Sequence, residues 1–152
     1  MSRMDQASRL IEASPETIYA AMTEADALVQ WLPPAGMSAK MLEFDLRPGG
    51  HYRMALRYDD ASIAGKSGDH ADIVSVGYAD LVPGALVAQT ADFVSDQPAF
   101  AGTMTLNWII EDRAEGALVT IRAQNVPRGI TAHDHVEGLR SSLDSLARFV
   151  ET

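Results

Sequence analysis

The last twenty residues constrain the fold most, because they predict a helix with one strongly apolar face. Apolar residues recur every three or four positions over roughly five turns: Val136, Leu139, Leu143, Leu146 and Val150. Thr131 and Asp134 stand at the spacing of an N-cap residue and the third helical residue. A helix with such a face must bury it against another large element.

That element is predicted between Met37 and Asn125, where the hydrophobic period falls from about 3.6 residues to about 2. Six strands are expected there: 38–46, 51–58, 70–80, 85–93, 102–111 and 117–125. Turn-forming residues separate several of them: Pro48-Gly49-Gly50, Pro83-Gly84 and Glu115-Gly116. Connections this short favour an antiparallel meander. The pattern does not decide which face of strands 70–80 and 85–93 points to the core. Asp72 and Asp92 can therefore point inward or to solvent.

A further strand at 6–13 and two short helices precede this region. Ser14-Pro15-Glu16 offers an N-cap hydroxyl, a proline at the first helical position and an acid in the first turn. The second helix is expected to begin at Thr23, with Asp26 three residues on, and to end before Pro33-Pro34. The whole order predicts an α+β fold in which a curved antiparallel sheet wraps around a long C-terminal helix. We expect one domain over residues 1–152.

Four stretches resemble a known superfamily: IEASPETIY at 11–19, WLPP at 31–34, FDLRPGGHYRM at 44–54 and GLRSSLDSL at 138–146. Together they resemble the helix-grip fold of the START and birch-pollen-allergen superfamily, SRPBCC. Within it, the chain is similar to the branch named after the activator of the heat-shock-protein ATPase (AHSA-like). The resemblance implies a cavity for an apolar ligand between the sheet and the C-terminal helix. The superfamily also includes lipid carriers, hormone receptors and cyclases.

The charge and composition exclude several classes of function. Twelve lysine and arginine residues against 21 aspartate and glutamate residues give a net charge of −9, which repels nucleic acid and anionic lipid. The absence of cysteine excludes disulfides, thiolate metal sites and cysteine nucleophiles. No apolar run approaches the roughly 18 residues of a membrane helix, and no signal sequence is visible. We therefore expect a cytoplasmic protein with no membrane insertion.

Two motifs suggest a ligand but fail on spacing. Gly65-Lys66-Ser67 lacks the upstream glycine of a phosphate-binding loop, since Asp60 stands in its place. His133 and His135 lie two residues apart on a helix, so their side chains diverge by about 200° and cannot share a metal ion. No metal or cofactor is expected. His135 precedes Leu139 by one turn and is a candidate polar group at the mouth of the cavity.

The inward faces of the strands supply the remaining site candidates. Tyr52 and Met54 share a face of strand 51–58, Trp108 lies on strand 102–111, and Asn125 is expected as a buried amide. This surface is either an ordinary filled core or the lining of an apolar cavity. The candidate ligand-binding residues are Tyr52, Met54, Trp108, Asn125, His135 and Leu139. Trp31 is expected to be a wedge that holds the second helix on the sheet, or else a lid.

These residues predict a protein that binds an apolar or amphipathic small molecule, as a monomer or homodimer. One alternative is a cyclase-, aromatase- or hydrolase-like enzyme that uses the same cavity, with His135 or Asn125 as hydrogen-bond donors. The sequence assigns no catalytic residue to it. The other alternative is a co-chaperone or stress-response protein that works through its surface.

Overall fold

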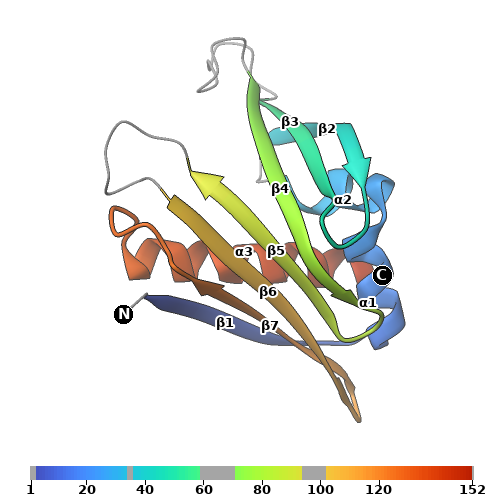
Figure 1. The fold of residues 1–152 in the computed structure, drawn as a ribbon. Helices are drawn as coiled ribbons and strands as arrows, with labels where there is room; N and C mark the ends of the chain where they lie inside the picture. The colour runs from blue at the N-terminus through green and yellow to red at the C-terminus, as the bar shows by residue number, and fades with distance from the viewer. Residues whose placement is uncertain (1–2, 34–35, 59–70, 94–101, 152) are drawn as a thin grey trace.

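The computed structural model describes residues 3–33, 36–58, 71–93 and 102–151 (Figure 1). Along the chain the elements are β1 (Met4–Ile11), α1 (Pro15–Thr23), α2 (Ala25–Trp31), β2 (Met37–Asp45), β3 (His51–Tyr58), β4 (Ala71–Val82), β5 (Leu86–Phe93), β6 (Gly102–Arg113), β7 (Gly116–Gln124) and α3 (Ala132–Val150). The predicted order of elements and the α+β class are confirmed. The expected loop at 59–69, with its Gly65-Lys66-Ser67, lies outside the described residues.

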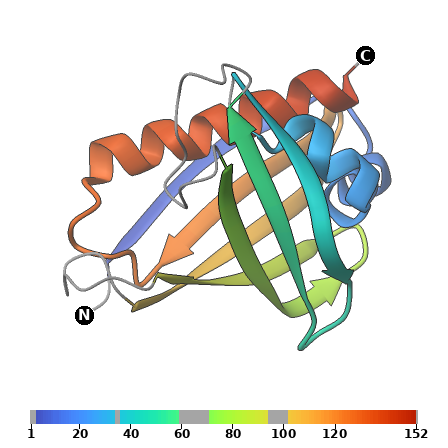
Figure 2. The same cartoon turned by 90° about the horizontal axis from the view of Figure 1, so that it is seen from above.

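The seven strands form one antiparallel sheet in the order β1-β7-β6-β5-β4-β3-β2. Neighbours from β2 to β7 follow one another in sequence, whereas β1 pairs with β7 from Met4 opposite Gln124 to Ile11 opposite Ala117. Irregular registers at Met41/Glu43 and Tyr78/Asp80 bend β2 and β4. Figure 2 shows β2, β3 and β4 crossing the direction of β1 and β7, so the sheet is strongly curved.

Helix α3 lies along the edge strand β1 on the concave side of the sheet (Figure 1). Three contacts join them in order: His135 Nδ1 with Asp5 Oδ2, Arg9 Nη1 with Asp144 Oδ1, and the Glu12 N–H with Glu151 Oε2. From residue 5 to 12 an extended chain rises about 23 Å, and from residue 135 to 151 a helix rises about 24 Å. The two elements therefore stay in register over their whole length.

Helices α1 and α2 close one end of the concave face. Ser14 caps α1, since its Oγ accepts a hydrogen bond from the Thr17 N–H. The expected start of α2 at Thr23 is wrong. Thr23 belongs to the last turn of α1, where its hydroxyl donates to the Tyr19 carbonyl at 2.7 Å. Glu24 takes the N-cap position of α2 and makes no side-chain capping bond.

Burial shows which side chains of β4 and β5 point into the core, a question that the sequence left open. Val76 and Tyr78 of β4 and Val87 and Gln89 of β5 are buried, and three of the four belong to the core cluster beneath the helices. The core therefore continues across both strands. The side chains of Asp72 and Asp92 fall outside the part of the chain that the structure describes.

The packing of α3 predicts a large cost for shortening Leu143, whose side chain is only 1% exposed. Leu143→Ala leaves a cavity between α3 and the sheet and should lower the free energy of unfolding by about 2–5 kcal/mol. Leu42→Ala is the control, because Leu42 is 45% exposed. That change should stay within about 0.5 kcal/mol in urea denaturation. Equal losses for the two variants would contradict the docking of α3 on the core.

Candidate functional site

The concave face of the sheet is the candidate site, and most of its side chains beside α1 and α2 are buried. These helices bury their inner side chains there: Ile18, Met22, Leu28 and Trp31. The Trp31 Nε1–H donates to the Ala21 carbonyl at 2.8 Å, and the Trp31 ring meets that of Trp108 edge to face, with centroids 5.7 Å apart. Trp31 is thus held by α1 and by the sheet, as expected for a side chain that keeps the second helix on the sheet.

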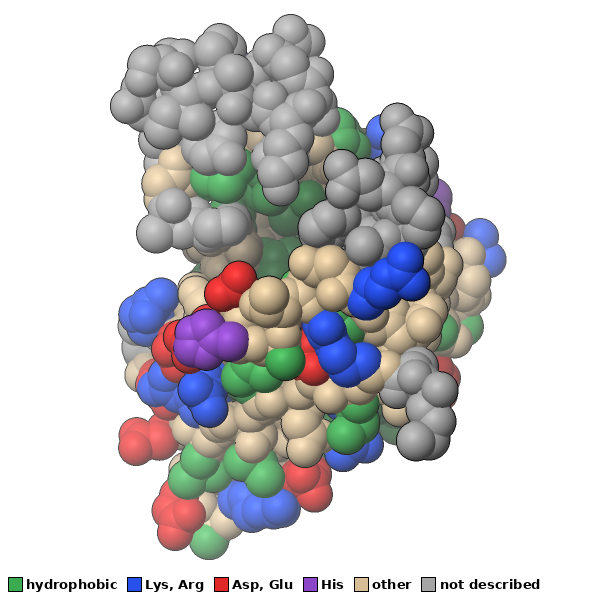
Figure 3. Space-filling view, turned by 90° about the vertical axis from the view of Figure 1, so that its left-hand side faces the viewer, with side chains coloured by type: hydrophobic (Ala, Val, Ile, Leu, Met, Phe, Trp, Pro, Cys, Tyr) green, Lys and Arg blue, Asp and Glu red, His purple; other side chains and the backbone are tan. Residues whose placement is uncertain are grey.

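Elsewhere on this face, Met104 and Ala123 are also buried. Several other hydrophobic side chains are only partly buried: Ala39, Met41, Leu56, Val74, Ala91 and Leu106. Figure 3 looks onto the end of the molecule at which α3 begins. It shows a hollow there, with hydrophobic side chains at its floor. In the described part of the chain, α1 and α2 cover the concave face at one end only.

A small cavity of about 20 Å³ lies deep on the concave face. Its lining is mostly apolar: Met22, Leu28, Trp31, Leu32, Tyr52, Gln89 and Trp108. Gln89 is its buried polar residue, only 8% exposed, and its Oε1 accepts a hydrogen bond from the Trp108 Nε1–H at 3.2 Å. A space of this size holds about one water molecule. This cavity by itself therefore has no room for a larger molecule.

Tyr52 lines this cavity, and the buried Tyr78 lies next to Tyr52, with ring centroids 5.9 Å apart. Burial raises the pKa of Tyr52 to about 12, and burial, together with the nearby Tyr52 and Tyr19, raises the pKa of Tyr78 as well. The Tyr78 hydroxyl has no hydrogen-bond partner among the described residues. Both side chains therefore stay neutral at physiological pH and present hydroxyl groups, not phenolates, to the interior.

Four of the six candidate residues from the sequence lie together. Tyr52, Met54, Trp108 and Leu139 are buried and belong to one core cluster. Their role in binding a ligand stays a prediction.

The expected inward orientation of Asn125 is wrong. β7 ends at Gln124, and Asn125 follows in the left-handed region with φ of 59°, a conformation that asparagine tolerates better than most residues. Its side chain is exposed, and its Nδ2 donates to the Thr103 carbonyl at 2.6 Å. Because the strand stops one residue earlier than expected, the alternation that placed Asn125 inside no longer applies.

His135 is joined to β1. Its Nδ1 lies 2.8 Å from Asp5 Oδ2, and the Arg3 guanidinium contacts the same oxygen at 3.0 Å. The His135 and Asp5 side chains are 13% and 4% exposed. This polar cluster fixes the first turn of α3 on the edge strand.

Gln89 and Asp5 were missed by the sequence reasoning. Gln89 lies between Val87 and Ala91, and an alternation read through these three residues would have placed it inside. Asp5 precedes the strand predicted at 6–13, so the sequence pattern places it outside the sheet, whereas β1 begins at Met4.

The described ranges contain no group of three or more histidine, aspartate or glutamate side chains placed to hold a metal ion. Within the same ranges, every helix is too short or too polar to cross a bilayer.

A curved antiparallel sheet gripping a C-terminal helix, with two short helices after the first strand, defines the helix-grip class. The family model described as activator of Hsp90 ATPase homolog 1-like protein matches residues 12–151. The chain therefore belongs to this AHSA1-like family.

Solved structures agree with this assignment. A protein from Chromobacterium violaceum is 30% identical, with 98% of both chains covered and a TM-score of 0.81. The AHSA1-like protein from Aeromonas hydrophila is 15% identical, with 98% of this chain and 92% of that chain covered, at a TM-score of 0.77. A protein of unknown function from Staphylococcus aureus is 20% identical, with 99% and 94% covered, at 0.71. No curated protein matches the chain.

The raised pKa of Tyr52 predicts a loss of stability in alkali. Unfolded tyrosines ionise near pH 10, whereas Tyr52 in the folded chain does so near 12. Between these values the unfolded state releases a proton that the folded state retains, so the free energy of unfolding falls as pH rises. In Tyr52→Phe this fall should be shallower, by up to about 1.4 kcal/mol per pH unit. Urea titrations at several pH values test this; an unchanged slope would contradict the burial of the phenol.

Proposed function

We propose that the chain binds an apolar or amphipathic small molecule on the concave face of the sheet. The supporting observation is the unequal burial of this face. Beside α1 and α2 most of its side chains are buried, whereas several hydrophobic residues elsewhere, such as Leu56, Val74 and Leu106, are only partly buried. A hollow with an apolar floor opens on the surface where α3 begins (Figure 3). Concave, mostly apolar surfaces with a few polar groups are typical of ligand sites.

The polar groups at the closed end favour a neutral group on the buried part of the ligand. Gln89 offers an amide and Tyr52 a neutral hydroxyl, and no charged side chain lines the small cavity beside them. Burying an unpaired charge there would cost far more than burying a hydroxyl or carbonyl that finds a partner. The inner end of the ligand is thus apolar or carries a hydroxyl, carbonyl or amide group.

Methionine side chains allow the concave face to change its shape. Four of the seven methionines of the chain belong to its core clusters: Met22, Met41, Met54 and Met104. Their unbranched side chains can change rotamer at low cost, so they fit ligands of different shapes. Such adjustment would enlarge the cavity of about 20 Å³ when a ligand enters.

A neutral fluorescent probe, N-phenyl-1-naphthylamine, tests this proposal. Its fluorescence should rise and saturate when it is titrated with the protein. Val74→Phe adds volume to the partly buried concave face and should weaken probe binding at least about tenfold. Val82→Phe, on the same strand but exposed, is the matched control and should bind as the unchanged chain does. Probe binding that is absent, or equal in the two variants, would overturn the proposal.

A further inference from the structure

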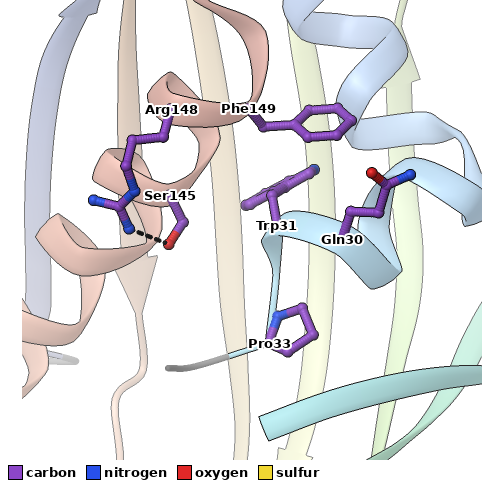
Figure 4. A pocket seen from close by; sticks show the side chains of 6 residues that line it. All are labelled: Gln30, Trp31, Pro33, Ser145, Arg148 and Phe149. Carbon is purple, nitrogen blue, oxygen red and sulfur yellow. Dashed lines mark hydrogen bonds between the residues drawn. The ribbon is translucent and has the colours of Figure 1, made fainter. Parts of the chain in front are cut away.

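A second concavity lies outside the sheet, between α2 and α3 (Figure 4). Its volume is about 330 Å³, within the range of small-molecule sites. Six residues line it: Gln30, Trp31, Pro33, Ser145, Arg148 and Phe149. Trp31 also lines the inner cavity, so its ring forms part of the wall between the two spaces. We refer to this outer concavity as the α2–α3 groove.

Arg148 and Ser145 provide hydrogen-bond donors on one side of the α2–α3 groove. The Arg148 Nη2 donates to Ser145 Oγ at 3.2 Å, as Figure 4 shows. Among the described residues no carboxylate pairs with Arg148, whereas Arg140 on the same helix pairs with Glu137. A guanidinium has five N–H donors, and the Ser145 hydroxyl, as the acceptor of this bond, keeps its own proton to donate. This arrangement suits a carboxylate.

Gln30 provides a hydrogen-bond acceptor on the opposite side of the α2–α3 groove. Its Nε2 donates to the Asp26 carbonyl at 3.0 Å, which fixes the orientation of the amide because a carbonyl can only accept. The Oε1 is left for another donor, and in Figure 4 it lies on the side of the amide nearer Trp31 and Phe149. The flat side chains of Trp31, Pro33 and Phe149 supply apolar contact between the two polar sides.

We infer that the α2–α3 groove binds a small planar organic carboxylate that carries a hydrogen-bond donor at its far end. The carboxylate lies on Arg148 and Ser145, the ring lies against Trp31 and Phe149, and the donor reaches Gln30 Oε1. The net charge of −9 repels anions in general, and the carbonyl ends of α2 and α3 add partial negative charge nearby. Binding therefore depends on Arg148.

The probe is 4-hydroxybenzoate, followed by nuclear magnetic resonance. The chain has two tryptophans, so the spectrum holds two indole N–H signals, and Trp108→Phe identifies the one from Trp31. The Trp31 signal should shift and saturate on titration. Arg148→Gln should weaken binding at least about tenfold. Arg140 is also exposed and lies two turns earlier on α3, so Arg140→Gln is the matched control and should leave the affinity unchanged.

Neutral 4-hydroxybenzamide should bind at least about tenfold more weakly than the acid. The inference is overturned if Arg148→Gln binds 4-hydroxybenzoate as the unchanged chain does, or if no saturable shift occurs. It is also overturned if only the Trp108 signal responds, because the compound would then lie in the concave face. Circular dichroism of both variants confirms folding. Failure of this inference leaves the proposed function standing, because the neutral probe tests that function separately.

Discussion

The match in length between α3 and β1 is the constraint on which the rest of the structure depends. Three contacts, each joining residues more than 125 positions apart, keep the helix parallel to this edge strand. The main contacts of α3 are therefore with β1, α1 and α2. The helix crosses one side of the concave face and leaves the inner side chains of β3, β4 and β5 to other partners.

Helices α1 and α2 provide those partners at one end only. Trp31 is central there, since it donates to Ala21 from its indole and packs edge to face on Trp108. Beyond it, several hydrophobic residues of the sheet are only partly buried, and the surface is hollowed (Figure 3). The proposed ligand site is thus a consequence of where the two short helices end. The same tryptophan separates that site from the α2–α3 groove on its outer side.

The fold was predictable because local patterns determine most of it. The apolar stripe of α3, the short turns between strands and the capping of α1 by Ser14 each depend on residues close together in sequence. Asn125 was misplaced because the exact end of a strand depends on the left-handed turn that follows it. The contact of Asp5 with His135 joins residues 130 positions apart, so no local pattern indicates it. Gln89 was overlooked because a polar residue inside a strand indicates solvent exposure unless its facing is known. The enzymatic and co-chaperone alternatives stay predictions.

Native mass spectrometry of freshly purified protein tests the central claim most directly. We expect the mass of the folded chain to exceed that of the denatured chain by a small molecule, which is released on denaturation and is apolar or amphipathic. The same spectrum reports whether the chain is a monomer or a homodimer. A folded chain that carries no added mass, and that takes up none when offered mixed neutral lipids, would contradict the assignment of the concave face as a ligand site.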